Sequence, residues 1–490
     1  MLKSFPAEKQ QLDNCVLEEH AFAVTHSNDS YVVSSDRVYT LDSRELAPDV
    51  LQNCFVASCG SIIIRTAAID TRDKALQLVE VIKMIAPEKR SGEWRIVSSQ
   101  LAMPDQEWGL ITAQQRQLLS FNLESDIPVR CVHINIATEH FFFQSLEVRL
   151  PETSLRDLNL IARQENVEAL ATYCYWMSEE MEKTIRQFVQ TDTFKYELEW
   201  RMKDFDHEAR SAILKAVRTK IFDLLQKLGE AEKRIGTNQK EREEIHREMI
   251  TIEKELIILK EELRQALEAQ IELLIEVERS INRIVINYPE LRPLAQAVSM
   301  LKTLLQSAIA DKQIVELSWA GRMIVIQLLN DHLGAISVIN CDTGLERTHM
   351  AYALRLAVVD IKQNVPLDTL LNLAVNWDRI TKEANIKLHK EGLHADLTSE
   401  GQLLLEIRKK MLHYLHVFCK PIAACNPHSL LSTPHEGHLT NSDFLNCLPF
   451  EFEGERLCFY DSQTGKPTTL TKAGMKLLVK LNILQGGSNG

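Results

Sequence analysis

The sequence lacks the features that would place the protein in a membrane, on nucleic acid or in an oxidising compartment. No run of about 18 apolar residues occurs, and the N-terminal MLKSFPAEKQQLDN lacks the apolar core of a secretion signal. The formal net charge of −12 argues against sequence-independent nucleic-acid binding, which needs a basic surface. The ten cysteines form no CxxC pair, which is typical of reduced thiols. We therefore expect a soluble, cytoplasmic protein that binds no nucleic acid.

Three regions with different patterns follow one another along the chain. Residues 1–203 mix strand-like segments such as SYVVSSDRVYTL with helical ones such as DKALQLVEVIKMI. Residues 204–287 carry long helical stripes, and residues 288–490 return to mixed patterning. The sequence therefore predicts a mixed α/β body, divided in two by an inserted helical hairpin or coiled coil.

The predicted helical arm carries a heptad seam. Its apolar positions are spaced alternately by four and three residues, with Gln270 as a polar member: Ile245, Met249, Ile252, Leu256, Leu259, Leu263, Ala266, Gln270, Leu273 and Val277. Periodicity specifies a buried seam but not its partner. Packing on the same chain and coiled-coil self-association both remain open.

The segment ISVINCDTGLERTHMAYALRLAV, residues 336–358, raises the question of function. Residues 335–340, with the β-branched Ile336, Val338 and Ile339, predict a strand that delivers Cys341, and Gly344 permits a tight turn. Apolar residues at helical spacing begin just after Arg347. A strand, a short loop and a helix in this order point loop amides and the positive helix end at one small volume, which is the geometry of an anion site.

Each residue type in this segment has a chemical use. The field of the loop favours the thiolate of Cys341. Arg347 can hold two phosphate oxygens at once and stabilise charge in the transition state, and Thr348 can donate its hydroxyl to the sulfur. The expected phosphate-binding positions besides Arg347 are Asp342, Thr343, Gly344 and Leu345.

A second copy of the same spacing serves as a control. Cys59 is followed after five residues by Arg65 and then by Thr66. The intervening residues include three isoleucines, which cannot easily wrap their amides around an anion. We interpret this copy as a buried strand.

The segment Cys341-Asp-Thr-Gly-Leu-Glu-Arg-Thr348 resembles the signature loop of the cysteine-based phosphatases. Within that superfamily it is similar to the branch whose loops end in acid-Arg-Thr: the myotubularin and Sac-domain phosphoinositide phosphatases, and the inositol-phosphate phosphatases that bacterial pathogens secrete into host cells. The segment Val132-His-Ile-Asn-Ile-Ala137 resembles a short Val-Asn motif of the same effectors.

The resemblance implies a catalytic domain like that of cysteine phosphatases, with phosphoryl transfer to Cys341, hydrolysis of the phosphocysteine by water, and no metal or cofactor. It implies a phosphoinositide or inositol phosphate substrate, peripheral contact with membranes, and a bacterial effector in the host cytoplasm. In the myotubularin-like branch the loop acid is the proposed proton donor, so Glu346 is the candidate general acid.

Some positions depart from the family pattern. Asp342 and Leu345 stand where relatives that attack highly charged head groups often carry lysine, and Glu346 replaces the usual aspartate. The alternative for Glu346 is a solvated loop carboxylate or a partner for a nearby base. Asp378, in a Trp-Asp-Arg segment, is a rival acid.

Other readings stay open. A protein tyrosine or dual-specificity phosphatase would use the same nucleophile, and a coiled-coil scaffold could carry a non-catalytic phosphate-binding loop. Basic residues after the loop, among them Arg355 and Lys362, could serve a polyphosphate substrate or form a solvated helix face. Four zinc-capable residues share one short stretch, although their spacing is unusually tight: Cys425, His428, His435 and His438.

Overall fold

The computed structural model describes the following residues: 10–12, 15–21, 24–25, 30–31, 37–42, 51–56, 61–86, 93–102, 107–123, 129–136, 166–188, 207–235, 239–309, 317–341, 346–391, 396–408, 410–411, 451–453, 456–460 and 467–468. Every statement below refers to these parts of the chain.

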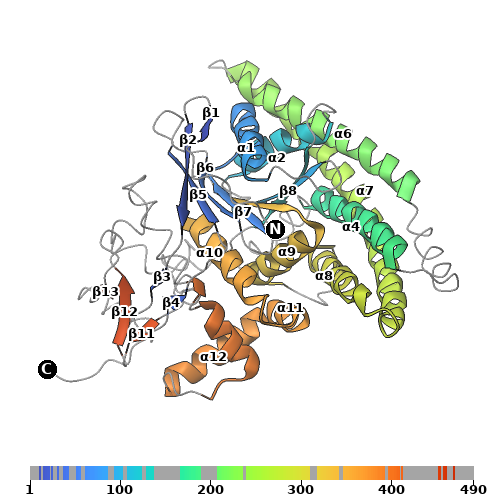
Figure 1. Cartoon of the computed structure of the whole chain (residues 1–490). Coiled ribbons are helices and arrows are strands. Elements are labelled where there is room, and N and C mark those ends of the chain that lie inside the picture. The colour runs from blue at the N-terminus through green and yellow to red at the C-terminus, as the bar shows by residue number, and fades with distance from the viewer. Residues whose placement is uncertain are drawn as a thin grey trace.

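An eight-stranded sheet forms the centre of the molecule (Figure 1). Its strands, in spatial order, are β1 (Gln10–Leu12), β2 (Cys15–Ala21), β5 (Arg37–Asp42), β6 (Leu51–Val56), β7 (Ile62–Thr66), β10 (Ile336–Asn340), β8 (Trp94–Gln100) and β9 (Val129–Asn135). The first five pair antiparallel, whereas β7, β10, β8 and β9 are all parallel. The predicted α/β fold class is confirmed.

Strand β10 comes from the far side of the predicted arm in sequence, yet it lies between β7 and β8. Val338 pairs with Ile64 on one side and with Ser98 on the other. The two parts of the chain that flank the arm therefore share one sheet. Two small sheets stand apart from it: β3 (Val24–Thr25) with β4 (Ser30–Tyr31), and β11 (Glu451–Glu453), β12 (Arg456–Tyr460) and β13 (Pro467–Thr468).

Helices cover both faces of the parallel strands. Successive residues of a buried strand point to opposite faces, so apolar side chains on each face need a helix to cover them. Ile64 and Val338 pack with α1 (Arg72–Ile85) and α2 (Trp108–Leu123). Ile63 and Ile339 face the larger core on the other side. That core is built by α4 (Val167–Phe188), α8 (Arg292–Ile309), α9 (Trp319–Leu333) and α10 (Glu346–Ile361).

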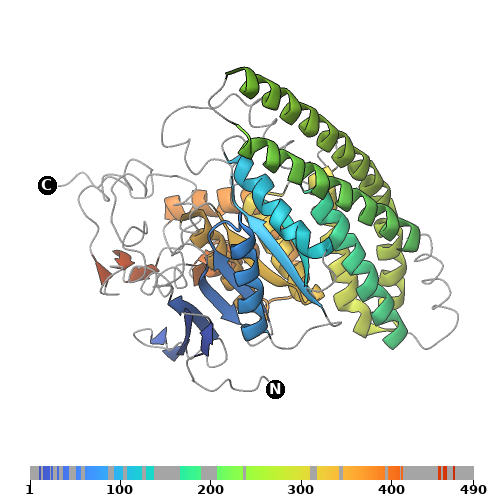
Figure 2. The same ribbon diagram turned by 90° about the horizontal axis from the view of Figure 1, so that it is seen from above.

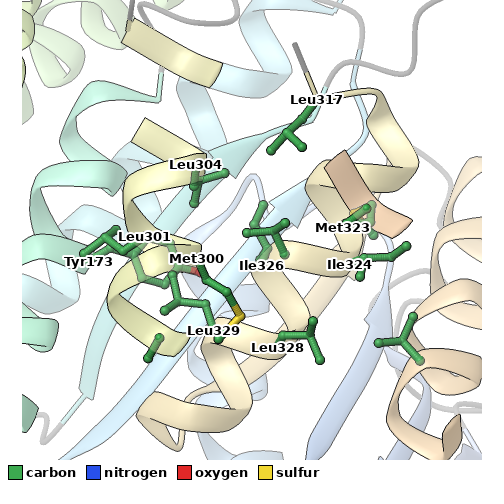
Figure 3. Packing of buried hydrophobic residues seen from close by; sticks show 14 of the residues in the cluster. Tyr173, Met300, Leu301, Leu304, Leu317, Met323, Ile324, Ile326, Leu328 and Leu329 are labelled. Carbon is green, nitrogen blue, oxygen red and sulfur yellow. The ribbon is translucent and has the colours of Figure 1, made fainter. Parts of the chain in front are cut away.

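The larger core is continuous between α8 and α9 (Figure 3). Met300 and Leu301 of α8 lie against Leu329 of α9, and Tyr173 of α4 borders the same cluster. Helix α9 also approaches α11 (Leu367–Val375) closely, since a Cβ atom at Gly321 would lie 2.3 Å from the carbonyl oxygen of Ala374. The 3₁₀ turn η3 (Pro289–Leu291) precedes α8, and α12 (Trp377–Glu391) follows α11.

Two long helices, α6 (His207–Lys233) and α7 (Gln239–Val285), fall within the predicted arm. They lie side by side along one flank of the molecule, next to α2 and α4 (Figure 2). Ile252 and Leu256 of α7 pack with Leu225 and Leu228 of α6. The helices thus pack on their own chain, while self-association and the division into three domains stay predictions.

The predicted seam is wrong by one residue at three positions, Ala266, Gln270 and Leu273, while Leu263 and Val277 are buried as predicted. Ala266 is exposed, whereas Leu267, Ile271 and Leu274 are buried. Over this stretch α7 leaves α6 and packs on α4 and α8 of the body. A straight helix with 3.6 residues per turn drifts from a strict heptad, so its buried stripe moves when no supercoiled partner holds it. Among the described helices, none has both the length and the apolar character needed to span a lipid bilayer.

Candidate active site

Cys341 lies where the parallel strands end. It directly follows β10, which has a parallel neighbour on each side, and its residue is 1% exposed. The backbone N–H of Leu101, just after β8, donates to the carbonyl of Asn340 at 2.8 Å. Ligands of open α/β sheets bind outside the carboxyl ends of the strands. The cysteine therefore lies at the carboxyl end of the parallel strands, where a site is expected.

Helix α10 begins at Glu346, only five residues after Cys341. The predicted strand and the predicted helix are both present, with a short connection between them. Glu346 and Arg347 occupy the first two positions of the helix, where backbone N–H groups and the helix dipole favour an anion. Residues 342–345 lie outside the described residues, as do the side chains of Glu346 and Arg347.

Thr348 is the residue of the acid-Arg-Thr motif whose surroundings the structure describes. It is fully buried in the first turn of α10, and its Oγ1 has no hydrogen-bond partner among the described residues. A buried hydroxyl without a partner costs about 1–3 kcal/mol. Thr348 therefore carries an unsatisfied buried hydroxyl two residues after the start of α10.

Arg355 follows Thr348 by two helical turns and is fully buried. Its Nη2 donates to Ser99 Oγ at 2.6 Å, while Nε and Nη1 have no hydrogen-bond partner among the described residues. Burial lowers the pKa of Arg355 to about 10, against the opposing effects of Tyr173 and Asp331. Two hypotheses were open for this cation, a solvated helix face and a contact with substrate, and its burial contradicts the first.

A polar layer lies at the strand ends, on the face covered by α2. Gln114 of α2 donates through Nε2 to Asn340 Oδ1 at 2.9 Å and to Ser98 Oγ at 3.0 Å. The same Nε2 lies 3.4 Å from His133 Nδ1, and Asn340 Nδ2 donates to Ser98 Oγ at 3.0 Å. Sequence reasoning missed Gln114, because one glutamine in an amphipathic helix carries no signal of its contacts.

The described part of the Val-Asn segment, residues 132–136, lies at the carboxyl end of β9, which pairs with β8. Both His133 and Asn135 are buried there. The Asn135 side chain donates to the carbonyl of Ala102 at 3.2 Å, and its backbone is held by the side chain of Asn166. These residues therefore lie at the carboxyl end of the parallel strands, as Cys341 does.

Cys131, Cys174 and Cys341, whose side chains the structure describes, form no disulfide. Burial raises the pKa of the Cys131 thiol, and Glu168 nearby raises it further. Cys131 lies within β9, not at its end, and stays a protonated thiol. In the control copy of the loop spacing, residues 62–66 form strand β7 with Arg65 buried, which confirms the strand; Cys59 lies outside the described residues.

The remaining candidates lie elsewhere. Asp378 is in the first turn of α12, beside the buried Trp377. Lys362 forms an ion pair with Asp331. The cluster of Cys425, His428, His435 and His438 lies outside the described residues, and the described part of the chain contains no group of three or more metal-capable side chains.

Comparisons with known proteins give distant likenesses. No family model matches the chain, and no curated protein matches it in sequence. A solved structure of a Legionella phosphoinositide phosphatase, SidF, is 10% identical, with 84% of this chain and 71% of that chain covered at a TM-score of 0.41. A second structure, of a novel Legionella phosphoinositide phosphatase, is 8% identical, with 83% and 72% covered at a TM-score of 0.38. These values are too low to support an argument about function, which therefore rests on the residues of the site.

Proposed function

We propose that this protein is a cysteine-dependent phosphatase that removes phosphate from phosphoinositides or inositol phosphates through a phosphocysteine intermediate. The observation that carries the proposal is the position of Cys341. It directly follows a central parallel strand and stands five residues before the start of α10, so the Cys-x5-Arg spacing runs from the end of a strand to the first turn of a helix. The buried hydroxyl of Thr348, with no partner among the described residues, supports a ligand at the same place.

The proposed reaction proceeds in two steps. Loop amides of residues 342–345 and the Arg347 guanidinium hold the phosphate, and Cys341 Sγ attacks the phosphorus. The bond from phosphorus to the substrate oxygen breaks, and that oxygen takes a proton from Glu346. A water molecule then attacks the phosphocysteine and gives its proton to Glu346, which releases inorganic phosphate and restores the thiolate.

The substrate class comes from the acid-Arg-Thr ending of the loop, which resembles the loops of phosphoinositide and inositol phosphate phosphatases. The same resemblance supports the proposal that the protein is a bacterial effector that acts in the host cytoplasm and contacts membranes peripherally. A tyrosine or dual-specificity protein phosphatase is the alternative that would share the nucleophile.

Phosphate release from phosphoinositides, soluble inositol phosphates and phosphopeptides tests the proposal. Cys341→Ser should lower turnover by roughly a thousandfold or more and leave substrate binding largely intact, because a serine hydroxyl fits the same space but is a poor nucleophile here. Cys131→Ser is the matched control, since Cys131 is equally buried but lies within a strand. Equal activity of Cys341→Ser and the wild type would rule out the cysteine mechanism. A preference for phosphopeptides would favour a tyrosine or dual-specificity protein phosphatase.

A further inference from the structure

Gln114 stands at the point where the four parallel strands end. It lies on α2, which packs beside α1 against the sheet (Figure 1), and it is 0% exposed. Its Oε1 accepts from the backbone N–H of Ile69, just beyond β7, at 2.8 Å. Its Nε2 reaches Ser98 of β8, His133 of β9 and Asn340 of β10 at 3.0, 3.4 and 2.9 Å. One buried amide therefore contacts all four strands or their exits.

Asn340 is the contact that leads to the chemistry. It is the last residue of β10 and shares a peptide bond with Cys341. Gln114 holds its Oδ1, Ser98 Oγ holds its Nδ2, and Leu101 N–H holds its carbonyl. Since successive side chains of a strand point to opposite faces, a fixed Asn340 on the α2 side directs Cys341 toward the core beside α10.

The polar layer around Gln114 stays uncharged. Burial, together with the charge of Lys260, lowers the pKa of His133 to about 3, so its ring is neutral at the pH where a phosphatase in a cell would work. Lys260 comes from α7, is buried, and lies with its Nζ 5.8 Å from the centre of the Trp108 ring. Protonation of His133 therefore does not disturb the hydrogen bonds that hold Asn340.

We propose that Gln114 is a positioning residue that sets the direction of Cys341 through Asn340. The proposal rests on the proposed phosphatase function. A reacting atom displaced by about 1 Å can cost roughly a hundredfold in rate. Loss of the Gln114 amide should therefore slow the chemical step while the phosphate-binding groups of the loop and of α10 still hold the substrate.

The adjacent Gln115 provides a matched control. It lies on the same helix and is also buried, but both polar atoms of its amide lack a hydrogen-bond partner among the described residues. Replacement of either glutamine by leucine removes an amide of the same size from the same helix. Only Gln114→Leu removes contacts with Asn340.

The experiment measures kcat and KM with the preferred phosphoinositide or inositol phosphate. Gln114→Leu should lower kcat by roughly ten- to a hundredfold with KM changed by less than about twofold, while Gln115→Leu keeps both. Asn340→Ala breaks the same bond from its other end and carries the test if Gln114→Leu does not fold. The double variant should lose little more than the worse single variant, because both act through one contact.

The outcomes separate the two proposals. A wild-type protein whose turnover is absent, or does not require Cys341, overturns the phosphatase function and the inference with it. Turnover that requires Cys341 but falls equally in the Gln114 and Gln115 variants, or a loss confined to KM, overturns only the role of Gln114.

Discussion

The two ends of the parallel strands differ in how their buried polar groups are satisfied. At the amino end, side chains from α4, α9, β10 and the turns before β7 and after α10 form one connected network. Its bonds are Tyr173 to Asn330 at 2.6 Å, Asn330 to Ser337 at 2.8 Å, Ser337 to Gln327 at 3.0 Å, Gln327 to Asp331 at 2.8 Å, Ser61 to Asp331 at 2.6 Å, Lys362 to Ser61 at 3.1 Å, and the Lys362–Asp331 ion pair.

At the carboxyl end, several buried polar atoms have no hydrogen-bond partner among the described residues. They are Thr348 Oγ1, both amide atoms of Gln100, Asn135 Oδ1 and His133 Nε2. Native proteins pair most buried polar groups, and departures concentrate at functional sites. The contrast indicates that the amino end serves stability and that the carboxyl end, which holds Cys341, is arranged for a ligand.

The largest expected effect tests the amino end. Asp331→Asn leaves the Lys362 ammonium without its carboxylate, and the two side chains are only 11% and 17% exposed. We expect a loss of about 3 kcal/mol in the free energy of unfolding, measured by urea denaturation, with kcat changed by less than about twofold.

Asp360→Asn is the control at the same end of α10, because the Asp360–Lys410 pair is 32% and 24% exposed. It should cost less than about 1 kcal/mol. A large fall in kcat for Asp331→Asn at unchanged stability would contradict the division of roles between the two ends.

The next effect tests the carboxyl end. Arg347→Lys keeps the charge but loses the planar fork that grips two phosphate oxygens. Turnover should fall by roughly a hundredfold or more, equivalent to about 2.7 kcal/mol, with an unchanged melting temperature. Arg379→Lys, in an exposed pair with Glu383, should leave both quantities unchanged. Near-normal turnover of Arg347→Lys would assign Arg347 a structural role.

Glu346→Gln tests the proton donor. If Glu346 protonates the leaving oxygen, hydrolysis of phosphoinositides should slow by roughly a hundredfold, because an alkoxide leaves badly without a proton. Aryl phosphates should be slowed much less, since a phenolate needs little help. Glu346→Asp should retain substantial activity. Equal losses on both kinds of substrate would direct the search for the acid to Asp342 or Asp378.

The strand and helix that flank residues 342–345 could be predicted because each carries its own local pattern. Residues 335–340 contain the β-branched Ile336, Val338 and Ile339, and the helix after Arg347 has a 3.6-residue apolar period. The position of β10 between β7 and β8 could not be predicted, since strand order depends on contacts between segments that lie far apart in sequence. Local pattern therefore predicted the elements of the site but not their neighbours.

Polar contacts show the same limit. Gln114 and Gln115 are adjacent, identical in chemistry and both buried, yet only the first contacts four parts of the sheet. A rotation of about 100° between successive helical residues separates them, and sequence alone does not reveal which direction faces the strand ends. For the same reason the burial of Arg355 could not be foreseen from its position after the loop.

The smallest expected effect gives the sharpest separation of stability from function. Thr348→Val keeps the shape of a fully buried side chain and removes a hydroxyl that has no partner among the described residues. The free energy of unfolding should stay constant or rise by about 1 kcal/mol, because an unsatisfied polar group is replaced by a methyl. Turnover should nevertheless fall by roughly tenfold, since the hydroxyl no longer donates to the sulfur or to the bound phosphate. Thr348→Ser, which keeps the hydroxyl, should recover most of that turnover. If the valine variant is less stable and equally active, the hydroxyl has an ordinary structural partner and Thr348 does not belong to the site.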